Sequence, residues 1–141
     1  MNNRGYVLLV EDNPDEVFIT QRAFKKGEVA NPLMVVTSGR QALDFLFSQG
    51  SYADRDKNDK PAVILLDLKL PLVSGLDVLK ELKSNPNTNP IPILVLTSST
   101  EERDQTESYR LGANDFICKP TSLLEFIEIV KTIKARWLDA S

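Results

Sequence analysis

Five short apolar runs, each followed by a segment with helical periodicity, constrain the fold of this chain more than any other feature of its sequence. The runs are rich in Val, Ile and Leu and cover residues 6–10, 33–37, 63–68, 91–97 and 115–118. Their length and composition are typical of strands that are buried on both faces, as in a parallel sheet. Right-handed connections between parallel strands then place helices on both faces of the sheet.

Start and stop signals delimit the expected helices. Asn13 offers an N-cap with an acid, Glu16, three residues later, and Gly27 is a stop signal. Ser99 and Ser122 open similar capping-box patterns. The later helices are expected at about 40–48, 75–84, 99–112 and 122–137. We therefore predict a single α/β domain, a flavodoxin-like (βα)5 three-layer sandwich with a parallel sheet of strand order 2-1-3-4-5.

One polar stretch interrupts this alternation. Residues 49–60 have no hydrophobic period and predict a long surface loop before the third strand. A mobile, solvated insertion is the favoured interpretation, and a loop that contacts a partner is the alternative. The domain is expected to span residues 1–141, with its core at about 5–137 and no output domain.

The composition excludes several classes of function. No apolar run approaches the roughly 18–20 residues of a membrane span, and a net charge of −3 gives no electrostatic footprint for nucleic acid. The chain has no histidine and one cysteine, which excludes a Ser-His-Asp or Cys-His catalytic arrangement and most zinc sites. Without an export signal, the expected location is the cytoplasm, and no membrane or nucleic-acid partner is expected.

Polar side chains follow the apolar runs at the edge where a site is expected. In open α/β sheets, sites lie beyond the carboxyl ends of the strands where the strand order reverses, here between the first and third strands. Glu11 and Asp12 follow the first strand and Asp67 the third, while Thr97 ends the fourth and Lys119 follows the fifth. Three carboxylates in close array need a compensating cation such as Mg²⁺. An aspartate nucleophile, a metal, a hydroxyl and a lysine together suit phosphoryl transfer.

Each of these signals is weak when taken alone. An acid pair after a strand is more often a loop or a helix cap than a metal site. Asp67 could be a turn residue, Thr97 could cap a helix, and Lys119 could be a solvated surface lysine. Their common position at strand ends is what makes the set specific.

Four motifs resemble the receiver domains of two-component response regulators. They are LLVEDNP at 8–14, ILLDLKLPLVSG at 64–75, VLTSS at 95–99 and LGANDFICKP at 111–120. The resemblance covers nearly the whole chain. It implies a signalling switch, not an enzyme acting on other substrates, that accepts a phosphoryl group on Asp67 from a sensor histidine kinase or a histidine phosphotransfer protein. The cofactor would be Mg²⁺ or Mn²⁺, and the output would be a protein–protein contact.

The resemblance also implies how the cation and the phosphoryl group would be held. Asp12 and Asp67 would ligate the cation directly, Glu11 would act largely through water, and the backbone carbonyl of Lys69 would complete the protein ligands. Roles near the phosphoryl group and the switch are implied for Thr97 and Lys119 (phosphoryl binding), Phe116 (switch aromatic), Pro120 (after a cis peptide bond) and Gly75 (after the phosphoacceptor loop).

Three positions and the chain end add narrower expectations. Lys69 is basic where small or polar side chains are frequent, so we expect it to change the stability of the phosphoryl group. Phe116 has no hydroxyl to donate, and Cys118 is expected to be an inert core residue. The loop and the tail ARWLDAS resemble stand-alone receivers that partner phytochrome-type sensor kinases. A homodimer would use the face formed by the fourth helix, fifth strand and fifth helix.

Three other functions remain as alternatives. A phosphatase of the haloacid-dehalogenase type also uses a strand-end aspartate, but the second acid that it needs is replaced by Lys69. A pseudo-receiver would be a pure interaction module, yet such proteins usually lack one of the acids, the hydroxyl or the lysine. A flavodoxin would need a Ser/Thr/Gly-rich phosphate loop after the first strand, which the sequence lacks.

Overall fold

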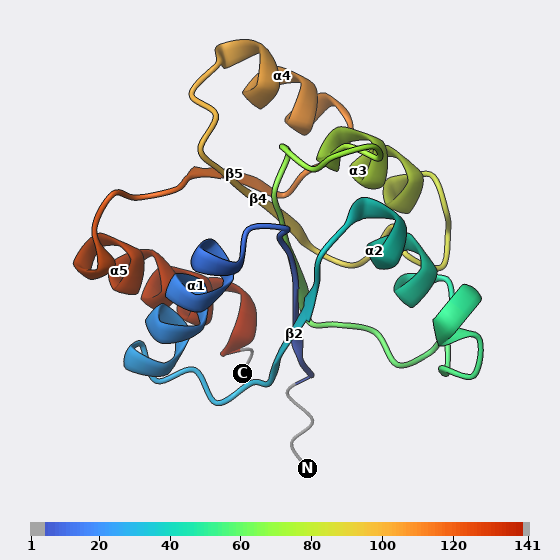
Figure 1. Ribbon diagram of the computed structural model, residues 1–141, viewed down its shortest axis with the longest axis horizontal. Helices are drawn as coiled ribbons and strands as arrows, with labels where there is room; N and C mark the ends of the chain where they lie inside the picture. The colour runs from blue at the N-terminus through green and yellow to red at the C-terminus, as the bar shows by residue number, and fades with distance from the viewer. Residues whose placement is uncertain (1–4, 140–141) are drawn as a thin grey trace.

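The computed structural model describes residues 5–139, and its centre is a five-stranded sheet. The strands are β1 (Val7–Val10), β2 (Leu33–Val36), β3 (Val63–Leu66), β4 (Ile93–Thr97) and β5 (Asp115–Cys118). All four pairings are parallel and the order is β2-β1-β3-β4-β5 (Figure 1). The predicted topology is confirmed, while residues 1–4 and 140–141 of the predicted domain lie outside the described residues.

Helices cover both faces of the sheet. They are α1 (Pro14–Lys26), α2 (Gly39–Leu46), α3 (Gly75–Lys83), α4 (Glu102–Arg110) and α5 (Leu123–Ile133). Helices α1 and α5 lie on one side, and α2 and α3 lie on the other with α4 next to α3 (Figure 1). Every helix within residues 5–139 is too short or too polar to cross a bilayer. These layers form the expected three-layer sandwich.

Alternation along the central strands divides the core into two halves. Val7 and Leu9 face the α1–α5 side, while Leu8 and Val10 face the α2–α3 side. The same alternation continues in β3 and β4, so every residue of β1, β3 and β4 is buried. This explains why the sequence of these strands is continuously apolar instead of alternating.

The two edge strands are less buried than the sequence suggested. Met34 of β2 is 38% exposed, and the side chain of Cys118 in β5 is also exposed. The expectation that Cys118 is a core residue is therefore wrong. The reason is that β5 pairs only with β4, and its last residue lies at the open margin of the sheet.

The helix caps match the sequence signals at two of the three predicted capping positions, Asn13 and Ser122, and Ser74 caps α3 in the same way. Asn13, Ser74 and Ser122 each accept hydrogen bonds from backbone N–H groups of the first turn. Ser99 does not cap α4, because its hydroxyl donates to Asp104 Oδ2 at 2.6 Å and the helix begins after Glu101. A carboxylate acceptor inside the helix thus displaces the predicted capping box.

The 49–60 segment is anchored to the domain instead of being a freely solvated insertion. It contains a 3₁₀ turn, Gly50–Tyr52, and Arg55 reaches back from it to the start of β1. The guanidinium of Arg55 donates to Phe45 O at 3.0 Å and Tyr6 Oη at 2.7 Å, as well as to Asp59 O. It also lies 4.0 Å from the centroid of the Phe45 ring. The polar composition hid this anchor, because an arginine fork can bind carbonyls without any hydrophobic signal.

A short π-helical turn, Lys134–Leu138, extends α5. It brings Trp137 to a groove of ≈ 140 Å³ that is shared with Ile117 of β5 and Ile129 of α5. The guanidinium of Arg136 lies 5.6 Å from the Trp137 ring centroid. The only tryptophan of the chain therefore lies beside β5 and α5.

Candidate functional site

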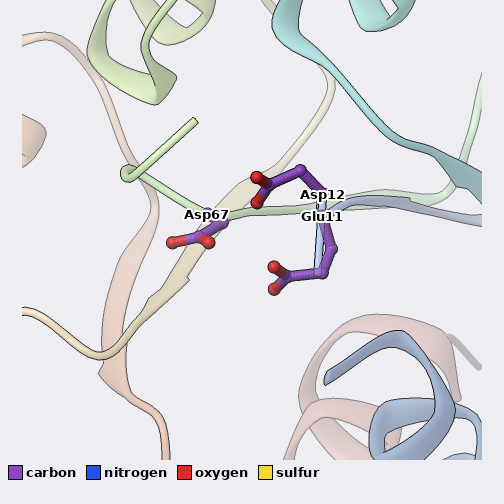
Figure 2. Close-up of side chains that lie close together, drawn as sticks. All are labelled: Glu11, Asp12 and Asp67. Atoms are coloured by element: carbon purple, nitrogen blue, oxygen red, sulfur yellow. The ribbon is translucent and has the colours of Figure 1, made fainter. Parts of the chain in front are cut away.

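Three carboxylates converge where β1 and β3 end. Glu11 and Asp12 follow β1 directly, and Asp67 follows β3, whose Leu66 is in register with Val10. One carboxylate oxygen from each acid lies within 4.8 Å of the others (Figure 2). Glu11 and Asp67 are only 2% and 6% exposed, whereas Asp12 is open to solvent. The predicted meeting of the three acids is thus found in the structure.

Lys119 supplies the positive charge at this site. Its backbone N–H donates to Thr97 O at 2.8 Å, which fixes the chain just beyond β5 beside the end of β4. Its Nζ lies 2.6 Å from Glu11 Oε1 and 3.4 Å from Asp67 Oδ2. A third carboxylate, that of Glu16, also accepts a hydrogen bond from Nζ. From its place three residues after Asn13, Glu16 was predicted only as part of a helix cap, and its contact with Lys119 was not expected.

Burial and the ion pair between Glu11 and Lys119 act in opposite directions on the pKa of each partner. Burial, together with the nearby charge of Asp67, raises the pKa of Glu11 above its usual value despite the ion pair with Lys119. Burial alone would lower the pKa of Lys119, but its hydrogen bonds to Glu11 and Glu16 and the charge of Asp67 outweigh burial and raise it. Lys119 therefore stays charged at neutral pH, whereas ionisation of the buried Glu11 carboxyl costs free energy.

The backbone around Asp67 is packed too tightly for a larger residue at position 75. A Cβ added to Gly75 would lie 2.2 Å from the carbonyl oxygen of Asp67 and 2.5 Å from Leu68 Cα. The N–H of Gly75 donates to Leu68 O at 3.0 Å, and the N–H of Lys69 donates to Asp67 Oδ1 at 3.2 Å. The glycine thus lets α3 start against the loop that orients the Asp67 carboxylate.

Thr97 is the last residue of β4, and Phe116 lies in β5, two residues before the end of that strand. Thr97 is fully buried, and its hydroxyl accepts a hydrogen bond from Ser99 N at 3.3 Å. Among residues 5–139 this hydroxyl makes no hydrogen bond to the three acids. Phe116 is half-buried and packs against the core on the α2–α3 side. Thr97 thus lies at the same edge of the sheet as the acids, and Phe116 lies further back in β5.

The peptide bond before Pro120 is trans, which corrects the expectation of a cis bond. Residues 5–139 contain no cis peptide bond. The trans form is the one that an X–Pro bond favours by about 0.5–1 kcal/mol when nothing else decides. Lys119 reaches the acids with this bond in the trans form.

The site combines carboxylate oxygens that can bind a hard cation with an ammonium that can bind an anion. The ammonium of Lys119 contacts the carboxylates of Glu11, Glu16 and Asp67. Asp12 adds a fourth carboxylate beside those of Glu11 and Asp67. Oxygen-only donors of this kind fit Mg²⁺ or Mn²⁺, and the uncompensated negative charge favours binding of such an ion. The nucleophilic carboxylate, the cation site and the lysine can thus act on one phosphoryl group.

Comparisons with known proteins agree with this geometry. Residues 7–131 match the model of the response regulator receiver domain family. The chain is 36% identical over 133 residues to the response regulator Rcp1 of Synechocystis sp., with 94% of this chain and 88% of Rcp1 covered. The Mn²⁺-bound crystal structure of Rcp1 superposes with a TM-score of 0.86 at 35% identity, covering 97% of this chain and 96% of the other.

Two further solved structures are similar over most of their length. The phosphorylated cyanobacterial phytochrome response regulator RcpA has a TM-score of 0.87 and 36% identity, with 97% and 96% of the two chains covered. The bacteriophytochrome response regulator AtBRR has a TM-score of 0.77 and 44% identity, with 94% of each chain covered. The acid cluster, the strand order and these matches agree, and the chain belongs to the response regulator receiver domain family.

Proposed function

We propose that Asp67 of this receiver domain accepts a phosphoryl group from a phosphohistidine of a sensor kinase or a histidine phosphotransfer protein. The observation that carries the proposal is the convergence of Glu11, Asp12 and Asp67 within 4.8 Å, with Lys119 Nζ 3.4 Å from Asp67. An Asp67 carboxylate oxygen forms the new O–P bond, and the P–N bond to the donor imidazole breaks. The domain is a signalling switch and not a metabolic enzyme.

The residues around Asp67 have separate tasks in this transfer. The N–H of Lys69 holds Asp67 Oδ1, which leaves the other oxygen for attack. The ammonium of Lys119 and the hydroxyl of Thr97 bind phosphoryl oxygens as negative charge builds up on them. Because Glu11 and Asp67 are almost fully buried, these charges act in a setting of low effective dielectric.

A divalent cation, Mg²⁺ or Mn²⁺, is the cofactor in this proposal. Asp12 and Asp67 would ligate it directly, Glu11 through water, and the carbonyl of Lys69 would be the remaining protein ligand. Bound there, the cation neutralises charge on the transferring phosphoryl oxygens. The oxygen-only donor set and the Mn²⁺-bound structure of the related Rcp1 support this assignment.

The output is proposed to be a change in the face formed by α4, β5 and α5. Inward movement of the Thr97 hydroxyl onto the phosphoryl group leaves space for Phe116 to follow, and this biases a two-state element. A downstream protein or a second copy of the chain would bind the altered face. The similarity to RcpA and AtBRR supports a phytochrome-type sensor kinase as the partner. The cytoplasm is the proposed compartment.

Intact-mass measurement tests the central step. The protein is incubated with acetyl phosphate and Mg²⁺ beside the Asp67→Asn variant. A gain of one phosphoryl group by the parent alone is the expected result. A folded parent that gains no mass and also fails to bind beryllofluoride would contradict the proposal and favour a pseudo-receiver.

A further inference from the structure

All three N–H donors of the Lys119 ammonium are directed at carboxylates. The acceptors are Glu11 at 2.6 Å, Asp67 at 3.4 Å and Glu16, whose contact with Nζ is short. An ammonium has no further donor to offer. A phosphoryl group at Asp67 can therefore gain a hydrogen bond from Lys119 only if one of these partners gives up its own.

Glu16 differs from the other two partners in origin and surroundings. It lies in the first turn of α1 and its side chain is 40% exposed, whereas the side chains of Glu11 and Asp67 are 3% and 8% exposed. Glu16 also lies outside the group of three carboxylates that can hold a cation. A cation bound by that group competes with Lys119 for Glu11 and Asp67 but leaves Glu16 with the lysine.

The start of α1 directs Glu16 to this position. Asn13 Oδ1 accepts hydrogen bonds from Asp15 N at 2.9 Å and Glu16 N at 3.2 Å, which fixes the backbone of the first turn. The Glu16 carboxylate is then directed to Lys119 and not back to the cap. Asp15, the neighbouring acid, is exposed and has no ion pair with Lys119 among the described residues.

We propose that Glu16 is a positioning residue that holds the Lys119 ammonium away from Asp67. This inference rests on the proposed function of the site. The distances support it, because Asp67 has the longest of the three contacts with Nζ. With the ammonium drawn toward α1, the Asp67 carboxylate stays available to a cation, but the lysine is less available to a phosphoryl group.

This position predicts effects of opposite sign on two ligands. Removing the charge of Glu16 lets Lys119 move toward Asp67 and Glu11, where it competes with Mg²⁺. The same change frees a lysine donor for an anion at Asp67 and removes a repelling charge. Loss of Glu16 therefore weakens cation binding and strengthens binding of a phosphoryl group or its analogue.

Titration calorimetry of the intact chain measures both effects. Mg²⁺ is titrated first into metal-free protein, and beryllofluoride is then titrated at saturating Mg²⁺. For Glu16→Gln we expect the Mg²⁺ dissociation constant to rise roughly three- to fivefold and the beryllofluoride constant to fall by a similar factor, as for one partly exposed ion pair. The matched control is Asp15→Asn, which removes the same charge one residue away and should change each constant less than about twofold.

A second variant separates contact from charge. Glu16→Asp keeps the charge but shortens the side chain by one methylene, so it should shift both constants in the same directions as Glu16→Gln. Parent-like constants for Glu16→Asp, equal behaviour of Glu16→Gln and Asp15→Asn, or a shift of both constants in one direction would each overturn the proposal. A parent that binds neither ligand would instead contradict the proposed function, and this inference with it.

Discussion

Two positively charged side chains bind at the two ends of β1, and their surroundings differ in charge. Beyond the carboxyl end, Lys119 is surrounded by the carboxylates of Glu11, Glu16 and Asp67. At the amino end, Arg55 is surrounded by two backbone carbonyls, a phenol oxygen and an aromatic ring. The first arrangement has an excess of negative charge that a metal or a phosphoryl group can use. The second pairs the two terminal nitrogens of the guanidinium with acceptors of the domain itself and brings no excess of negative charge, which indicates a structural role.

The different side chains suit these roles. A lysine is a compact point charge on a flexible stem, so its ammonium can exchange partners during a reaction. An arginine presents a planar fork of five donors that matches several fixed acceptors at once and can lie over a ring such as Phe45. The comparison leads to the following expectations, in order of decreasing effect.

Lys119→Met should cause the largest change. Without the ammonium, Glu11 and Asp67 are left buried and unpaired, and we expect a loss of about 3 kcal/mol in the free energy of unfolding in metal-free buffer. Because the pKa of Lys119 is raised in the folded state, its contribution should be complete below pH 10.5, the unfolded value, and be lost as the pH rises through the folded value.

Denaturant melts with and without Mg²⁺ check this expectation. A cation can replace the missing positive charge, so Mg²⁺ should recover most of the stability that Lys119→Met loses. A loss that Mg²⁺ leaves unchanged would show that Lys119 is structural in the same sense as Arg55.

Arg55→Met should cost about 2 kcal/mol, because it removes charge-assisted hydrogen bonds and the contact with the Phe45 ring. Mg²⁺ should not recover this loss, and beryllofluoride should bind the variant as it binds the parent. Chemical denaturation gives the first result and calorimetry the second. A change in beryllofluoride affinity would mean that the two ends of β1 are coupled.

Neutralising one acid at each end of β1 should give free energies of unfolding that differ by about 0.5–1 kcal/mol between the two variants. Asp12→Asn removes an exposed charge from a repelling cluster and should stabilise the metal-free protein. Asp59→Asn should change little, since Arg55 binds the backbone carbonyl of Asp59. Equal shifts in the thermal unfolding of both variants would remove this distinction.

The pH dependence of the stability of Glu11→Gln tests the carboxyl end of β1, where the acids lie. Burial raises the pKa of Glu11, so the folded protein holds this proton more tightly than the unfolded chain does. Protonation therefore adds stability as the pH falls from neutral through the raised pKa, and the gain is complete below 4.5, the unfolded value. The variant cannot titrate, so its stability relative to the parent should be highest at neutral pH and fall in acid. A gap that is constant with pH in metal-free melts would contradict this.

Lys69→Asn should have the smallest effect, because the Lys69 side chain is exposed and only its backbone N–H contacts Asp67. We expect the lifetime of the phosphoryl group to change about two- to fivefold, equivalent to less than about 1 kcal/mol in the barrier. Loss of the phosphoryl mass with time gives the rate. An unchanged rate would dismiss the expected role of this basic residue.

The sequence predicts the site better at its centre than around it. The site residues could be placed because each ends or directly follows a strand, and a parallel sheet brings strand ends together. They are Glu11, Asp12, Asp67, Thr97 and Lys119. The position of a residue relative to a strand does not predict where its side chain points. Nothing in the residue pattern indicates whether an acid in a first helical turn closes its own cap or binds a lysine that lies far away in the chain.

The errors elsewhere have local physical causes. Cys118 was taken for a core residue because its apolar run was interpreted as buried on both faces, although the predicted strand order already placed this strand at the edge of the sheet. Ser99 was assigned to a cap because the competing acceptor, Asp104, lies inside the helix. The anchoring role of Arg55 had no hydrophobic signal. The contacts of a long polar side chain depend on which groups the fold brings near it, and sequence spacing alone does not specify those groups.

The position of Trp137 makes this residue an intrinsic fluorescence probe. This side chain lies in the groove between β5 and α5, away from the acids, and the chain has no second tryptophan whose emission would overlap. Fluorescence quenching on addition of Mg²⁺ or beryllofluoride would therefore report a rearrangement that has travelled to the proposed output face. Emission from this one indole follows the transmitted signal, whereas calorimetry follows the binding event that starts it.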